Sequence, residues 1–140
     1  MTRALAVDYG GRRTGLAVSD AVGITALPLD SINSTDLQET VDGVVRVAIE
    51  KEATVVLLGM PYMPDGREGE QAARVRLFAS ELKKGLPKGT KIIFKDERYT
   101  TKAATSLWRQ AGIRGKQAKP FLDSTAAVVL LREYLEETPI

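Results

Sequence analysis

The chain opens with two short apolar runs joined by a glycine turn. Residues 3–7 read as an apolar strand that ends on Asp8, the turn at residues 9–11 contains two glycines, and residues 15–19 form the second run. Runs this short and this close together favour an antiparallel hairpin. A third apolar run, residues 24–29, follows a break at residues 20–23. The start of the chain therefore predicts three antiparallel strands.

After this meander, helical and strand patterns alternate. Residues 35–38 have the Thr-x-x-Gln form of a capping box, which predicts Thr35 as the N-cap of a first helix. Residues 54–58 predict a strand buried on both faces and ending at Gly59, and residues 91–95 predict a strand that ends on Asp96 and Glu97. The other expected helices carry Val75, Phe78, Ala79 and Leu82; Leu107 and Trp108, after Thr100 and Thr101; and the apolar residues 126–131, after Pro120.

This order of elements predicts the fold class. Three antiparallel strands followed by helix, strand, helix, strand and helix indicate a mixed α/β sheet of five strands with helices on both faces. A length of 140 residues with 44% hydrophobic residues fits one domain spanning residues 1–140.

Composition removes several kinds of chemistry. The chain has no Cys and no His, which excludes thiol nucleophiles, disulfides, Ser-His triads and histidine-ligated metals. Carboxylates, Lys, Tyr or metal-bound water must then carry any acid-base chemistry. The absence of cysteine and of an apolar stretch long enough to span a bilayer favours a soluble cytoplasmic protein without a membrane partner.

Three carboxylates stand at positions where open sheets bind ligands. Asp8 and Glu97 follow strands, and Asp123 lies in the first turn of the last predicted helix. If the strands before Asp8 and Glu97 are neighbours, their carboxylates converge. Each acid alone also has an ordinary structural explanation, as a turn cap, an ion pair with Arg98 or Arg12, or a helix N-terminal charge. Asp96 should point to the opposite face from Glu97, and Asp20 looks like a turn residue.

A carboxylate cluster of this kind favours a hard cation. Like charges about 4 Å apart repel by about 4 kcal/mol at an effective dielectric of 20, and a divalent cation removes that penalty. Mg²⁺ and Mn²⁺ prefer oxygen ligands, and one or two such ions support hydrolysis of phosphodiesters. Asp8, Glu97 and Asp123 are therefore the candidate catalytic residues and metal ligands.

Basic residues are concentrated in one part of the chain. Between residues 98 and 119 there are six basic residues and no Asp or Glu, although the net charge of the whole chain is only +2. A solvated helix face usually mixes signs, so this stretch favours a phosphate partner, with a solvated face as the alternative. The candidate nucleic-acid contacts, including two arginines of the first turn, are Arg12, Arg13, Arg98, Lys102, Arg114, Lys116 and Lys119.

Four motifs in the same order resemble the YqgF/RuvX family across essentially the whole chain. They are residues 7–10 with 15–20, residues 59–61 with Asp65, Gly66 and Gly69, residues 96–101, and residues 122–127. Residues 62–64 depart from the family pattern, which affects only the shape of that loop. The resemblance implies a ribonuclease H-like fold related to RuvC resolvases, with Asp8, Glu97 and Asp123 as the acids. Family members are described as Holliday junction resolvases and as nucleases that mature small-subunit ribosomal RNA.

The expected function is a Mg²⁺- or Mn²⁺-dependent endonuclease acting on branched DNA, on precursor ribosomal RNA, or on both. A nucleic-acid-binding module of the same fold without turnover is the main alternative. A nucleotide phosphotransferase is weaker, because such proteins enclose nucleotide between two domains. Resolution of a four-way junction would additionally require a homodimer on the junction.

Overall fold

The computed structural model describes the backbone of residues 3–97 and 119–137, and the side chains of residues 3–97 and 124–137. The helix expected after Thr100 and Thr101 lies outside these residues. The elements, in chain order, are β1 (Arg3–Asp8), β2 (Arg13–Ser19), β3 (Ala26–Asn33), α1 (Leu37–Glu50), β4 (Ala53–Met60), α2 (Glu70–Gly85), β5 (Lys91–Asp96) and α4 (Lys119–Glu137).

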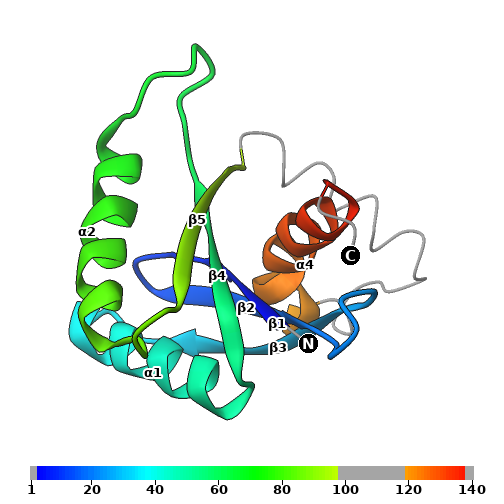
Figure 1. Ribbon diagram of the computed structural model, residues 1–140. Coiled ribbons are helices and arrows are strands. Elements are labelled where there is room, and N and C mark those ends of the chain that lie inside the picture. The colour runs from blue at the N-terminus through cyan, green and yellow to red at the C-terminus, as the bar shows by residue number, and fades with distance from the viewer. Residues whose placement is uncertain (1–2, 98–118, 138–140) are drawn as a thin grey trace.

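The strands form one mixed sheet in the order β3-β2-β1-β4-β5 (Figure 1). Strands β1, β2 and β3 pair antiparallel, whereas β4 pairs parallel with both β1 and β5. The predicted five-stranded sheet, with a meander followed by parallel strands, is confirmed. Strand β4 lies between β1 and β5, however, so the strands that precede Asp8 and Glu97 are not neighbours.

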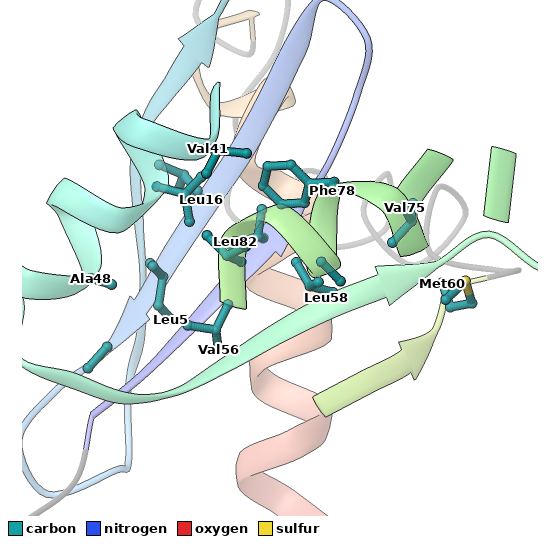
Figure 2. Packing of buried hydrophobic residues seen from close by; sticks show 14 of the residues in the cluster. Leu5, Leu16, Val41, Ala48, Val56, Leu58, Met60, Val75, Phe78 and Leu82 are labelled. Carbon is teal, nitrogen blue, oxygen red and sulfur yellow. The ribbon is translucent and has the colours of Figure 1, made fainter. Parts of the chain in front are cut away.

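Helices α1 and α2 cover one face of the sheet. Side chains alternate between faces along a strand, and Leu5 of β1 and Leu58 of β4 point toward these helices. In Figure 2, Leu5 lies between Ala48 of α1 and Val56 of β4, and Leu58 lies near Phe78 and Leu82 of α2. Both strands are apolar on the two faces, as expected for strands that are covered on both sides.

Helix α4 covers the opposite face (Figure 1). Ala4, Ala6 and Ala17 of the sheet pack with Leu130 and Leu131 of α4. The three alanines are small, which lets the helix lie close to the strands. The predicted burial of residues 126–131 is confirmed, with Ala126 half-buried and the others buried.

The start of α1 differs from the prediction by one residue. Asp36, not Thr35, is the N-cap: its backbone is extended (φ −91°, ψ 124°) and its carboxylate accepts the backbone N–H of Glu39 at 2.9 Å. Ser34 Oγ also donates to the Glu39 carboxylate at 2.6 Å. The Thr35–Gln38 capping box is therefore wrong, because the neighbouring carboxylate is the group that reaches the free N–H.

Asp20 is a turn residue, as expected. Its Oδ1 accepts the backbone N–H of Ile24 at 2.8 Å and that of Thr25 at 3.3 Å. These bonds, led by the one from Ile24, lower the pKa of Asp20 below its usual range. Because the turn extends to Thr25, the third strand begins at Ala26 rather than at Ile24.

Strand β4 continues through Gly59 to Met60 instead of ending before the glycine. Within residues 3–97 and 119–137, no helix is long and apolar enough to cross a membrane.

Candidate active site

Asp8 is held at the end of β1 by the glycine turn that follows it. Ala4, Ala6 and Asp8 alternate onto the face of the sheet that α4 covers. A Cβ on Gly10 would overlap the carbonyl oxygen of Arg13, so the turn requires glycine there. The buried Thr14 closes the turn by donating its hydroxyl to the Gly10 carbonyl at 3.3 Å.

Glu97 follows β5, and contacts with β4 and α4 position it. Its backbone N–H donates to the carbonyl of Met60, the last residue of β4, at 3.2 Å. Ile93 belongs to the core beneath α4, and Lys95, two residues later, pairs with Glu137 of α4 at 2.6 Å. Glu97 continues this alternation onto the α4 face.

Asp96 faces the other way, in agreement with the expected alternation. Phe94 is two residues earlier on the same face, and its ring lies under the guanidinium of Arg76 of α2, with the carbon of that group 5.1 Å from the ring centre. Asp96 is exposed, whereas Asp8 and Glu97 are half-buried.

The Asp8 and Glu97 side chains lie within hydrogen-bonding reach of each other, so that the protonated carboxyl of one can donate to the carboxylate of the other. The strands that carry them are separated by β4, and two strand spacings amount to about 10 Å. The contact is made over Gly59 of β4: a Cβ built on Gly59 would lie 2.7 Å from the Glu97 carboxylate carbon and 2.9 Å from Leu130 Cδ1. The carboxylate pair therefore lies between the backbone of β4 and the apolar surface of α4.

This environment raises both pKa values. Burial is the largest cause for Glu97, followed by the charge of Asp8, and together with a smaller effect of Asp96 they raise the pKa of Glu97 to about 9. Burial also raises the pKa of Asp8, although its hydrogen bond with Glu97 acts in the opposite direction. With a pKa of about 9, Glu97 holds a proton at neutral pH.

The start of α4 is anchored close to this pair. The buried Ser124 donates its hydroxyl to the Leu29 carbonyl at 2.6 Å and accepts the Leu16 N–H at 3.3 Å. Leu16 follows Gly15, the residue that pairs with Asp8. The backbone of Asp123 directly precedes Ser124, but its side chain lies outside the described residues, so its place as a third acid stays a prediction.

The predicted nucleic-acid contacts are only partly within the described residues. Arg12 and Arg13 are exposed and follow the turn after Asp8, which places them near the carboxyl end of β1. Lys119 begins α4, with its side chain outside the description. The positions of Arg98, Lys102, Arg114 and Lys116 also lie outside it.

The chemistry of the donors fits a hard divalent cation. Asp8 and Glu97 supply only carboxylate oxygens, the ligands that Mg²⁺ and Mn²⁺ prefer. A bound cation would also favour the ionised form of both acids, because its charge offsets the burial that raises both pKa values and the Asp8 charge that adds to the rise at Glu97. Among the side chains of residues 3–97 and 124–137, no group of three acidic residues is arranged to hold a metal ion.

Sequence reasoning missed the role of Gly59 in this geometry. From the sequence, Gly59 is predicted only as the end of the strand formed by residues 54–58. The structure instead places the Glu97 carboxylate over it. The sequence did contain a signal for this, because a glycine in a strand often marks a place where another group approaches the backbone closely.

Sequence relatives match this protein over almost the whole chain. A Sulfurihydrogenibium protein named "Putative pre-16S rRNA nuclease" is 36% identical over 137 residues, which covers 97% of this chain and 91% of the relative.

Two solved structures share the fold. RuvC of T. thermophilus in complex with a Holliday junction substrate has a TM-score of 0.59 at 15% identity, covering 98% of this chain and 95% of RuvC. Fowlpox virus resolvase with Holliday junction DNA has a TM-score of 0.62 at 16% identity, covering 97% of this chain and 98% of the resolvase. These similarities confirm the ribonuclease H-like fold implied by the sequence motifs. The family model described as "RuvX: Holliday junction resolvase" matches residues 2–137, and the chain belongs to that family.

Proposed function

We propose that this protein is a divalent-cation-dependent endonuclease that hydrolyses phosphodiesters of structured nucleic acid. The observation that carries the proposal is the contact between Asp8 and Glu97, two half-buried carboxylates with raised pKa values at the carboxyl edge of the sheet. Such a pair costs folding energy, and perturbed acids of this kind are concentrated at functional sites. Its place in a ribonuclease H-like fold of the RuvX family supports a nuclease.

The residues of this chain have distinct roles in the proposal. Asp8 and Glu97, with Asp123 as the third acid, would hold one or two ions of Mg²⁺ or Mn²⁺. Such ions, when bound, supply Lewis-acid chemistry that activates a water and stabilises the leaving oxygen. Glu97 must release its proton to act as a ligand. Leu130 and the backbone of β4, which lie on either side of Glu97, would limit the water around the pair.

The substrate is proposed from the family and its relatives. The family is described as Holliday junction resolvase, and the Sulfurihydrogenibium relative is named for pre-16S rRNA. Both are structured nucleic acids with phosphodiesters. The exposed Arg12 and Arg13, which follow the turn after Asp8, would contact phosphate, and the basic stretch from Arg98 to Lys119 would extend the contact surface.

The direct test measures cleavage of a four-way junction, duplex DNA, single strands and precursor ribosomal RNA side by side. Each reaction is run with Mg²⁺, with Mn²⁺ and with EDTA. Cleavage of at least one structured substrate that requires the cation is the expected result. Binding without cleavage under all cation conditions would contradict a nuclease and support a non-catalytic binding module.

The acidic residues are tested by near-isosteric substitution. Asp8→Asn, Glu97→Gln and Asp123→Asn should each reduce cleavage by at least about 100-fold, the lower range for loss of a group that acts in the transition state. Nucleic-acid binding should hold or tighten, because each change removes negative charge near phosphate.

Asp96→Asn is the matched control. It changes an adjacent carboxylate that is exposed on the opposite face, and its cleavage rate should stay close to that of the unmodified protein. Full activity in two of the three site variants would contradict the three-acid arrangement.

A further inference from the structure

We propose that Gly59 is a positioning residue for the carboxylate pair, because the missing side chain lets Glu97 reach Asp8 across β4. The inference rests on the proposed function, since it assigns a role in assembling the same site. Its basis is the position of Gly59 in the sheet and the atoms that lie above it.

Gly59 occupies the gap between the two acids. In β4 it pairs with Lys95 of β5, two residues before Glu97. On the other side Leu58 pairs with Val7 of β1, so Asp8 is the next residue along that strand. Leu57 belongs to the core beneath α4, and Gly59 is therefore on the same face of β4 as the two carboxylates.

Any larger residue at position 59 would compete for the space that Glu97 occupies. An added Cβ would lie 2.7 Å from the Glu97 carboxylate carbon and 2.9 Å from Leu130 Cδ1, both shorter than real side chains allow. The carboxylate is the end of a flexible side chain, whereas Leu130 is fully buried in the core. The substitution is thus expected to displace Glu97 from Asp8 rather than to move α4.

Gly11, unlike Gly59, has open space where a side chain would lie. Gly11 is also in the turn after Asp8, but an added Cβ there meets nothing within 4 Å. Its φ lies outside the left-handed region, so alanine is compatible with the backbone. Gly11→Ala is therefore a matched control close to the same site.

The first test measures Mn²⁺ binding by calorimetry, without nucleic acid. Gly59→Ala should keep the far-UV circular dichroism spectrum but bind Mn²⁺ about 10- to 100-fold more weakly, the usual effect of losing a group that orients a ligand. Gly11→Ala should bind like the unmodified protein. In a Glu97→Gln background, Gly59→Ala should have no further effect, because the side chain on which it acts is already altered.

Two binding results would overturn the inference. One is an unchanged Mn²⁺ affinity in Gly59→Ala. The other is an equal loss of affinity with and without the Glu97→Gln change, since this would show that Gly59 acts independently of Glu97.

A stability cycle tests the same contact without any metal. Thermal unfolding in EDTA is compared for Gly59→Ala alone and for Gly59→Ala combined with Glu97→Ala. The loss in Tm caused by Gly59→Ala should be smaller when Glu97 is absent. If Gly59→Ala alone does not fold, recovery of folding in the double variant supports the inference. An equal loss in both backgrounds, or failure of the double variant to fold, would assign the clash to Leu130 and overturn it.

The two tests separate this inference from the proposed function. A protein that binds no Mn²⁺ and cleaves no substrate contradicts the proposed nuclease, while the stability cycle still tests whether Gly59 makes room for Glu97.

Discussion

The contact between Asp8 and Glu97 lowers the folding stability of the protein. Asp8 and Glu97 are acids that are half-buried, in contact, and next to the apolar side chain of Leu130. A protein selected only for stability would gain by replacing one of them with an amide or an apolar group. The pair is therefore better explained by a ligand that requires negative charge than by packing.

The raised pKa of Glu97 leads to a prediction about stability and pH. Between pH 4.5, the ordinary pKa of a glutamate, and the raised pKa of about 9, the folded protein holds a proton that the unfolded chain has released. Stability contributed by protonated Glu97 is thus lost as pH rises through this window, by at most about 1.4 kcal/mol per pH unit. In EDTA, Glu97→Gln should therefore gain stability relative to the unmodified protein between pH 5 and pH 8, as measured by urea unfolding.

Adding Mn²⁺, and substituting Asp96, should test the same effect of Glu97 on stability. Mn²⁺ should stabilise the unmodified protein at pH 8 and have less effect on Glu97→Gln, because binding to the folded state alone raises the free energy of unfolding. Asp96→Asn removes only the smallest of the effects that raise the pKa of Glu97, so the stability of this variant should fall with pH over nearly the same range as that of the unmodified protein. Parallel stability curves for the unmodified protein and Glu97→Gln would show that Glu97 does not hold the proton.

In helix α1, one hydrogen bond, between the Asp36 carboxylate and the Glu39 N–H, determines where the helix begins. Asp36→Ala should destabilise the protein by about 0.5–2 kcal/mol, because its carboxylate accepts the otherwise unpaired N–H of Glu39. Thr35→Ala, one residue earlier, should change the free energy of unfolding by less than about 0.5 kcal/mol. Urea unfolding of the two variants distinguishes the caps. A larger loss for Thr35→Ala would contradict the observed start of α1.

Two polar contacts that contribute unequally to the free energy of unfolding fix helix α4 to the sheet. Ser124 is buried and bonds to both β2 and β3, so Ser124→Ala should cost about 1–3 kcal/mol in unfolding free energy. The Lys95 to Glu137 pair is exposed on the Glu137 side, and Glu137→Gln should cost less than about 1 kcal/mol. Equal losses in chemical unfolding would contradict this ranking of the two anchors.

The hydrogen bonds of Ser124 should also affect the rate of cleavage. Ser124 follows Asp123 directly and ties that part of α4 to Leu16, close to the end of β1. A Ser124→Ala variant that unfolds at a lower urea concentration should also cleave more slowly, if Asp123 acts in the same site as Asp8.

For the whole molecule, symmetry distinguishes the two proposed substrates. Resolving a four-way junction takes two cuts related by a twofold axis, which a protein with one site per chain coordinates as a C₂ dimer. Processing an RNA end takes one cut. If the protein resolves junctions, sedimentation with junction DNA should show two copies bound per junction, with Asp8 and Glu97 open in both. A strict monomer with one copy per junction would exclude paired resolution and leave single-site cleavage.

Local patterns were enough to predict most elements of this fold. The short apolar runs of β1, β2 and β5 and the helical spacing of Val75, Phe78, Ala79 and Leu82 are local features, because they depend on residues that are close together in the sequence. The same patterns placed Asp8 and Glu97 at strand ends and Asp96 on the opposite face. The family motifs added the relation to resolvases, which the family match confirms.

Other features depended on groups that are distant in the sequence. Thr35 and Asp36 are both good caps, and only the folded backbone decides which one reaches the N–H of Glu39. The order of strands likewise places β4 between Asp8 and Glu97, which no local pattern specifies. The contact between these acids then depends on an absent side chain at Gly59 and on Leu130 from the last helix, because burial and repulsion arise only when separate elements pack together.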